Sequence, residues 1–227
     1  MSDDPVIDDA ATLWAPGGRE GMPLLVLLHG YGADEHDLFA LAPHLPGGVA
    51  VASVAAPLLP PWPMPGRSWY AIDGLDGRRP EEVTAAARAL LRWIDDAART
   101  SSSIALLGFS QGAAVALQAM RLAPERFDAI VALSGYAAPG ELPHDEALRD
   151  LRPRVFWGRG TADDVIPPAL VARTAEWLPE HADLSGRVYR GLAHGISTDE
   201  LADVHAFLAS WLRDFDAPSD EPVDPSA

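Results

Sequence analysis

The stretch from Ile104 to Leu117, IALLGFSQGAAVAL, is the most informative part of the chain. Its first six residues form an apolar run too short for a helix, which predicts a strand buried on both faces, and the alanine-rich part predicts a helix. Between them, Gly108-Phe109-Ser110-Gln111-Gly112 has the pattern G-x-S-x-G. A serine on so sharp a strand-to-helix turn has a strained backbone, and the crowding two positions away requires glycine. The stretch therefore predicts a nucleophilic serine, Ser110.

Outward from this stretch, short apolar runs alternate with helical patterns. Further strands are expected at 24–28, 49–54, 127–133, 154–157 and 184–189, and helices at 80–98, 111–122, 167–177 and 198–212. Strands that alternate with helices in this way predict one α/β domain, with a mostly parallel central sheet flanked by helices. We expect this domain at residues 11–213, with acidic disordered tails at 1–10 and 214–227, where acids occur without bases.

The charge balance excludes several classes of function. The chain has 17 basic and 33 acidic residues, a net charge of −16, and no basic run. Such a chain gains nothing from counterion release on phosphate, so we expect no nucleic-acid partner and a neutral small-molecule substrate. No apolar run approaches the length of a membrane span, and the first residues lack the pattern of a secretory signal, so we expect no stable membrane insertion and a cytoplasmic location. Cysteine is absent, which excludes thiolate metal sites and a cysteine nucleophile.

A serine hydroxyl needs a base and an acid to become a nucleophile. When the serine occupies this kind of turn, the partners follow it in the order acid, then histidine. His205 lies among apolar residues of an expected helix, and His181 lies in a turn at the opposite edge of the sheet from Ser110. His194 occupies the loop Gly-Leu-Ala-His-Gly after the last expected strand, on the edge that carries the serine, so we choose His194 as the base.

The acid should follow the strand expected at 154–157. Two neighbouring carboxylates, Asp163 and Asp164, occur there, directly before the helix that Pro167 begins. Either of them could instead cap that helix. We assign Asp163 to the triad and leave the capping role to Asp164.

Acyl transfer also needs two N–H donors for the developing oxyanion. The backbone N–H of Gln111 is one of them, because it follows the nucleophile at the start of a helix. The second is expected from the loop after the first buried strand, where Gly30 and Gly32 allow the N–H of Tyr31 to turn inward. His29 precedes this loop, and we expect it to brace the loop rather than to react.

Six blocks of the sequence, taken together and in this order, resemble one known family. They are HGYGADEHDL (29–38), RSWY (67–70), LLGFSQGAAVAL (106–117), LSGY (133–136), GTADDVIPP (160–168) and GLAHG (191–195). The chain is similar from about residue 22 to 212 to the phospholipase/carboxylesterase family of small serine hydrolases, relatives of acyl-protein thioesterases. The resemblance implies an α/β-hydrolase fold without a large cap domain. It implies Ser110, Asp163 and His194 as the triad, with the N–H groups of Tyr31 and Gln111 as the oxyanion hole.

The resemblance also implies a function, namely hydrolysis of carboxylic esters through an acyl-serine intermediate, with lysophospholipids as a further substrate class. One alternative is an acyl-protein or acyl-thiol thioesterase that uses the same triad. Another is a non-catalytic α/β-hydrolase scaffold that binds a ligand. No cofactor is implied, and relatives often form homodimers. The cluster Asp34-Glu35-His36-Asp37 is typical of acids in the first turn of a helix, so we expect no metal.

An acyl pocket is expected beside the acid, near Val165 and Ile166. The proline-rich segment 55–68 is expected to be an irregular surface connection. Apolar residues in or next to it, namely Leu59, Met64 and Trp69, are candidates for the wall of an open groove. Each of them could equally be ordinary packing under a surface loop.

Overall fold

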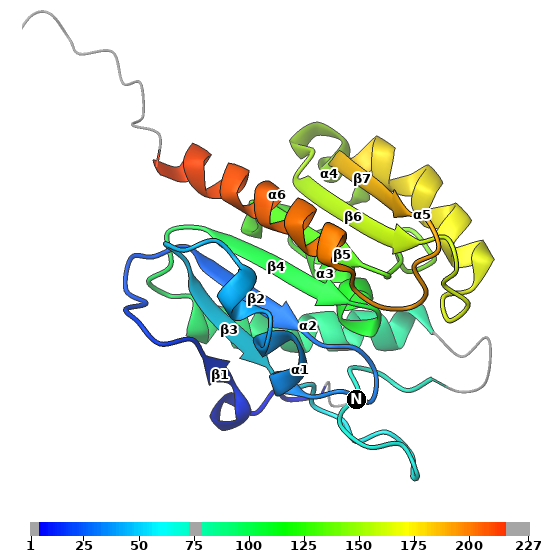
Figure 1. The fold of residues 1–227 in the computed structure, drawn as a ribbon, viewed down its shortest axis with the longest axis horizontal. Helices are drawn as coiled ribbons and strands as arrows, with labels where there is room; N and C mark the ends of the chain where they lie inside the picture. The colour runs from blue at the N-terminus through cyan, green and yellow to red at the C-terminus, as the bar shows by residue number, and fades with distance from the viewer. Residues whose placement is uncertain (1–4, 73–78, 217–227) are drawn as a thin grey trace, which may run out of the picture.

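The computed structural model describes residues 5–72 and 79–216 (Figure 1). Its strands are β1 (Leu13–Trp14), β2 (Leu24–Leu28), β3 (Ala50–Val54), β4 (Ile104–Phe109), β5 (Ala129–Leu133), β6 (Arg154–Gly160) and β7 (Asp183–Tyr189). Its α-helices are α1 (Glu35–Phe39), α2 (Pro80–Ala97), α3 (Gln111–Leu122), α4 (Asp145–Leu151), α5 (Pro168–His181) and α6 (Thr198–Asp216). Three single-turn 3₁₀ helices connect them, at Asp9–Ala11, Ala42–His44 and Pro124–Arg126.

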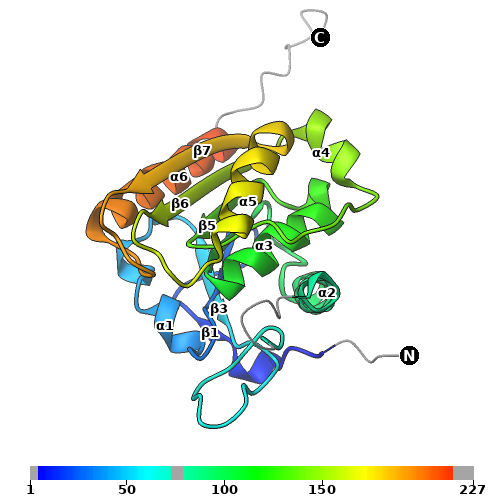
Figure 2. The same cartoon turned by 90° about the vertical axis from the view of Figure 1, so that its right-hand side faces the viewer.

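The seven strands form one sheet in the order β1-β3-β2-β4-β5-β6-β7. Each neighbouring pair is parallel except β1 and β3, which are antiparallel. Helices α1 and α6 cover one face of this sheet and α2 to α5 cover the other, as the two views show (Figures 1 and 2). The prediction of a mostly parallel sheet flanked by helices is therefore confirmed. Between β5 and β6 the described chain forms only the short helix α4, so no cap domain is inserted there.

The central strands are buried on both faces, which explains their unbroken apolar runs. In β4, Leu106 packs into the core on the α2 to α5 side, and Leu107 packs into the core beneath α1 and α6. Successive side chains of a strand point to opposite faces, so one short run supplies both cores. This packing fixes β4 in the middle of the sheet and places its carboxyl end, where Ser110 follows, between two other parallel strand ends.

Residues 5–10 differ from the sequence prediction, which assigned them to a disordered tail. Ile7 is buried in the core on the α2 side, and the side chain of Trp93 in α2 donates a hydrogen bond from Nε1 to Asp9 Oδ1 over 3.0 Å. One apolar side chain and one acceptor are enough to dock the segment, although its composition is acidic. Helix α6 also runs on to Asp216, into the other predicted tail, whose residues 217–227 lie outside the described part.

Of the helices that the structure describes, none combines the length and the apolar composition that crossing a membrane requires.

Candidate active site

Ser110 occupies the sharp turn between β4 and α3. Its backbone has φ 53° and ψ −113°, a conformation that L-residues rarely adopt. A side chain at Gly112 would place its Cβ 2.0 Å from the carbonyl oxygen of Leu28, and one at Gly108 would lie 2.5 Å from the backbone N of Ala113. Both glycines are therefore required sterically, as the sequence pattern predicts. The turn holds Ser110 at the carboxyl edge of the sheet.

The three residues expected to form a triad lie together in the structure. The hydroxyl of Ser110 is 2.9 Å from Nε2 of His194, and Nδ1 of the same ring is 2.8 Å from Oδ2 of Asp163. A carboxylate only accepts, so Nδ1 carries the proton and Nε2 is free to accept from the serine. Ser110 ends β4, Asp163 follows β6, and His194 lies between β7 and α6, so three parallel strands position the group.

The carboxyl group of Asp163 is held in its charged form. Burial alone would raise its pKa, but the hydrogen bonds from His194 and from two backbone N–H groups outweigh burial and hold the pKa below its ordinary value. Those N–H groups belong to Val165 and Ile166 and donate to Oδ1 over 3.0 and 3.2 Å. Oδ1 and Oδ2 thus both have partners, which fixes the plane of the carboxylate. Asp164 is exposed, and no side chain caps α5, so the capping role left to Asp164 is wrong.

The other two histidines that the sequence analysis considered are engaged elsewhere. The ring of His205 is bonded away from the triad, because its Nδ1 lies 2.9 Å from the carbonyl oxygen of His44. His181 is buried at the end of α5, where Nδ1 donates to the carbonyl of Trp177 and the two rings stack. Neither contacts Ser110, so the assignment of the base by loop position agrees with the geometry.

The expected oxyanion donors, the N–H groups of Tyr31 and Gln111, follow β2 and begin α3. The hydrogen bonds found among the described residues include no acceptor for either N–H group. The loop that carries Tyr31 is held from outside, because the N–H of Gly32 donates to the carbonyl of Arg67 and the N–H of Arg67 donates to Ala33. These two bonds, 2.9 and 2.8 Å long, pair the loop with the end of the proline-rich segment.

His29 braces the base of this loop, as the sequence analysis expects. It is fully buried; Nδ1 donates to the carbonyl of Gly30, and Nε2 accepts from the N–H of Ala56 over 3.1 Å. Burial lowers the pKa of His29, which keeps the ring neutral and suited to this pair of contacts.

Trp69 is part of this bracing and does not line a groove. Its side chain is fully buried, and Nε1 donates to the carbonyl of His29 over 2.9 Å. The expectation that Trp69 walls the acyl groove is therefore wrong, because apolar character alone does not separate a core side chain from a groove side chain. The side chain of Gln111 has a role that the sequence analysis missed: Oε1 accepts from the N–H of Trp69, and Nε2 donates to the carbonyl of Tyr70.

A pocket of about 310 Å³ lies beside the triad, between the ends of β5 and β6 and the start of α5. Its wall includes Asp163 and Ile166, so one predicted pocket residue lies where the sequence analysis expects it. The other three candidates are on the surface: Leu59 is 78% exposed, Met64 48% and Val165 47%. None of these three lines the pocket, and their role in binding a substrate remains a prediction.

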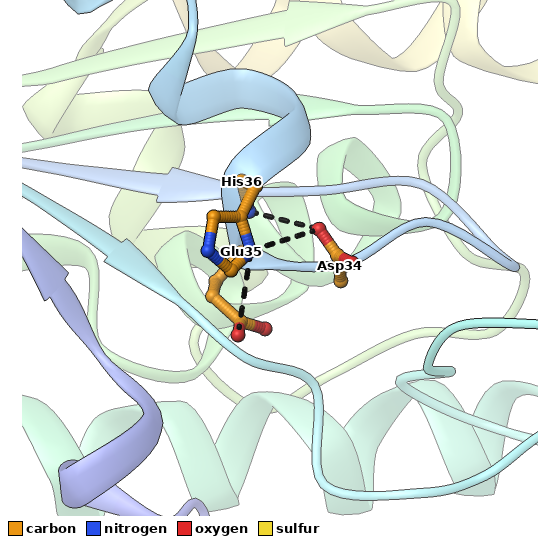
Figure 3. A group of neighbouring side chains, drawn as sticks. All are labelled: Asp34, Glu35 and His36. Carbon is orange, nitrogen blue, oxygen red and sulfur yellow. Dashed lines mark hydrogen bonds and ion pairs between the residues drawn. The ribbon is translucent and has the colours of Figure 1, made fainter.

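Asp34, Glu35 and His36 form a cluster of possible metal ligands on the oxyanion-loop side of the site (Figure 3). Their ligand atoms lie within 4.8 Å of one another. The contacts are those of a helix start, since Oδ1 of Asp34 accepts from the N–H of His36 at the N-cap of α1. Glu35 lies 4.0 Å from the guanidinium of Arg67 and so also supports the loop pairing.

The geometry supplies the parts that acyl transfer requires. Two hydrogen bonds connect a hydroxyl, a base and an oriented carboxylate, and the N–H groups of Tyr31 and Gln111 remain the expected oxyanion donors. Ser110 is 8% exposed and the side chain of His194 16%, so both remain accessible to a ligand only in small part. Water is partly excluded from the site, which strengthens its electrostatic interactions.

Comparisons with known proteins indicate one family. Residues 14–212 match the model of a family described as phospholipase/carboxylesterase. The chain is 34% identical over 109 residues to acyl-protein thioesterase 1 of Saccharomyces cerevisiae, an alignment that covers 46% of this chain and 48% of the yeast protein. It is 33% identical over 123 residues to the protein of the same name from Debaryomyces hansenii, covering 53% of each. The chain thus spans about half the length of these curated relatives.

Solved structures have the same fold. The crystal structure of esterase PE8 superposes with a TM-score of 0.72 at 29% identity, covering 91% of this chain and 99% of that one. The carboxylesterase of Bacillus cereus gives a TM-score of 0.75 at 20% identity, covering 88% and 93%.

Proposed function

Since the chain belongs to the phospholipase/carboxylesterase family, we propose that it is a serine hydrolase that cleaves small, neutral carboxylic esters. The observation that carries the proposal is the continuous series of hydrogen bonds from Ser110 through His194 to Asp163. The names of the relatives, which include esterases and thioesterases, support the same class of reaction.

In the proposed reaction, Nε2 of His194 takes the proton of Ser110 as Oγ attacks the ester carbonyl. The carbonyl oxygen becomes an oxyanion, which the N–H groups of Tyr31 and Gln111 stabilise. The ester C–O bond then breaks, and the imidazolium gives its proton to the departing alkoxide, which leaves as the alcohol. A water molecule, deprotonated by the same imidazole, hydrolyses the acyl-serine and releases the acid.

Asp163 orients the base throughout these steps and stays ionised. Its lowered pKa means that the carboxylate is charged when the imidazolium forms, so the charges of His194 and Asp163 balance in the transition state. The pairing of His194 with Asp163 therefore stabilises the transition state more than the ground state.

A thioester substrate is the second candidate, because acyl-protein thioesterases are among the relatives. The same residues would serve, with a thiolate instead of an alkoxide as the leaving group. Rates on matched oxygen and sulfur esters with one acyl group would distinguish the two. The cytoplasmic location and the homodimer remain predictions, which cell fractionation and ultracentrifugation would test.

The proposal is tested with a fluorophosphonate probe and with 4-nitrophenyl butyrate, on the wild type and on Ser110→Ala. We expect the probe to add to the wild type alone, by intact mass, and the substitution to lower turnover by about 10⁴-fold or more. Ser102→Ala, which removes an exposed hydroxyl just before β4, at the end of the strand away from Ser110, is the control for a general loss of structure. If the probe labels neither protein, and no ester turns over, the binding-scaffold alternative replaces the proposal.

A further inference from the structure

The pocket of about 310 Å³ borders the candidate triad at two points. Asp163 in its wall is the hydrogen-bond partner of His194, and Gly135 lies so close to the nucleophile turn that a Cβ there would be 3.3 Å from the carbonyl oxygen of Ser110. Much of the remaining wall is aliphatic and comes from Ile166, just before α5, and from the first turns of α5, including Val171 and Ala172. A group that extends from an ester bound at Ser110 can therefore enter this pocket.

Among the residues that line the pocket, the one cation is Arg159. Arg159 lies near the end of β6, and its guanidinium is 5.3 Å from the ring centroid of Trp157, two residues earlier on the same strand face. The side chain is half-buried, and no carboxylate in the described part of the chain pairs with it. Its Nε is buried without a hydrogen-bond partner among the described residues, as is Oγ of Ser134 in the same wall.

The single carboxylate in the wall, Asp163, does not neutralise Arg159. Oδ1 of Asp163 accepts two backbone N–H groups and Oδ2 accepts from His194, so the charge of Asp163 is already balanced locally. The pocket also lies at the amino-terminal end of α5, where the helix dipole favours an anion. A guanidinium left unpaired in a partly apolar pocket is suited to a planar anion, which it can bind through two parallel hydrogen bonds.

We propose that this pocket is a carboxylate subsite, in which Arg159 pairs with a carboxylate carried by the ester substrate. The inference rests on the proposed esterase function and changes its substrate from a neutral ester to an anionic one: a monoester of a dicarboxylic acid, or a hydroxy acid acylated at its hydroxyl with its carboxylate free. The net charge of −16 repels anions at long range, so this selectivity comes from Arg159 and not from the field of the whole protein. The substrate proposed here therefore carries a single anionic group.

Two aryl esters of equal acyl length test the subsite: the 4-nitrophenyl monoester of glutaric acid, with a free carboxylate, and neutral 4-nitrophenyl valerate. In Arg159→Gln we expect kcat/KM for the glutarate monoester to fall about tenfold or more through KM, and kcat/KM for the valerate to stay within about twofold. Arg159→Lys should restore part of the loss, because it keeps the charge without the planar fork. Glycolic acid acylated at its hydroxyl shows whether Arg159 instead binds a carboxylate in the alcohol part of the ester.

Arg149→Gln is the matched control, since Arg149 is an exposed arginine on α4 outside the pocket. It removes the same charge and should leave the ratio of the two rates unchanged. If Arg159→Gln lowers both rates equally, or if Arg149→Gln shifts the ratio as much, the subsite does not exist.

Direct binding separates this inference from the esterase proposal. Calorimetric titration of glutarate into Ser110→Ala measures the subsite without turnover, and Arg159→Gln added to that protein should abolish the binding. Binding that is unaffected by the second substitution overturns the subsite even if esters are cleaved. Failure of Ser110→Ala to lower ester hydrolysis overturns the esterase proposal even if glutarate binds.

Discussion

Two buried acidic side chains near β6 behave in opposite ways. Asp163, in the loop after β6, accepts three hydrogen bonds, and its pKa is held below the ordinary value. Glu200, in the first turn of α6, is fully buried, and neither of its side-chain oxygens has a hydrogen-bond partner among the described residues. Burial, together with the nearby charge of Asp203, raises the pKa of Glu200 to about 7. The hydrogen-bond partners of a buried carboxyl, together with its depth, therefore decide whether it is charged.

The space that holds Glu200 is created by a glycine. A Cβ at Gly158 in β6 would lie 2.1 Å from Oε1 of Glu200, so the carboxyl occupies the position of a missing side chain. The contrast with Asp163 is thus one of surroundings: three hydrogen bonds outweigh burial at Asp163, whereas at Glu200 burial outweighs the nearby backbone N–H of Ser197.

Removing the charge of Asp163 should have the largest effect. In Asp163→Asn the backbone N–H groups keep an acceptor, but the amide faces Nδ1 of His194 and favours the wrong tautomer of the ring. We expect kcat on 4-nitrophenyl butyrate to fall about 10³ to 10⁴-fold, with little change in the thermal midpoint.

Asp164→Asn is the control for that substitution, because it removes a neighbouring charge that is exposed. Activity within about threefold of the wild type is expected for it, since an exposed charge at this distance is screened. Equal losses in the two variants would show that the net charge of the loop matters and that the pairing of Asp163 with His194 does not.

A third buried acid extends the comparison to stability. Asp145 in α4 binds the fully buried Arg121 through two hydrogen bonds, of 2.8 and 2.6 Å. Burial would raise the pKa of Asp145, but these bonds lower it below the ordinary value. Asp145→Asn leaves the guanidinium without its counter-charge, so we expect the free energy of unfolding in urea to fall by about 3–5 kcal/mol.

The exposed neighbour Glu146 serves as the reference, and Glu146→Gln should change the free energy of unfolding by less than about 0.5 kcal/mol. A loss of that small size in Asp145→Asn would mean that Arg121 is satisfied by its backbone acceptors, the carbonyls of Ala138 and Gly140.

The smallest effect is expected from Glu200→Gln, which should raise the free energy of unfolding where Asp145→Asn lowers it. The folded protein holds a proton on Glu200 up to about pH 7, whereas the unfolded chain releases it near the ordinary value of 4.5. The unfolded state binds fewer protons between these values, so stability falls as the pH rises through this window. Glu200→Gln removes the titration, and we expect it to be more stable than the wild type at pH 8 by up to about 3 kcal/mol, with a smaller difference at pH 5.

Urea unfolding at both pH values measures this difference. Glu176→Gln on the exposed face of α5 is the matched control, because it removes the same charge without altering a buried group. Parallel pH profiles for the wild type and Glu200→Gln would show that Glu200 is ionised at both values and finds a partner in solution.

Much of the fold could be predicted because its determinants are local. The glycines around Ser110 and the loop position of His194 are visible in the sequence, and the α/β-hydrolase fold and the family resemblance that they indicate are confirmed. Helix α4 was not predicted, since its seven residues span about two turns and show no clear apolar stripe. The docking of residues 5–10 depends on a contact with α2, more than 80 residues away, which no local pattern encodes.

The candidate site was predictable in its reacting groups and not in its surroundings. Trp69 and Leu59 are both large apolar residues near prolines, yet the first is fully buried and the second is 78% exposed. Glu200 has the sequence pattern of an ordinary exposed acid at a helix start, because its burial depends on Gly158, which is 42 positions earlier. Such pairings exist only in three dimensions, and the orphaned side chain of Arg159 belongs to the same class.

The proline-rich segment has two parts with different tolerance of change. Its tip carries the exposed Leu59, Trp62 and Met64, and its end is bound through Arg67 to the loop of Tyr31. Mutant libraries confined to the tip can vary the apolar rim while the backbone donors stay in place. A graft that replaces the whole segment would instead carry the oxyanion loop with it, so the boundary for loop exchange in enzyme engineering lies before Gly66, where a Cβ would meet the carbonyl of Gly32 at 2.3 Å.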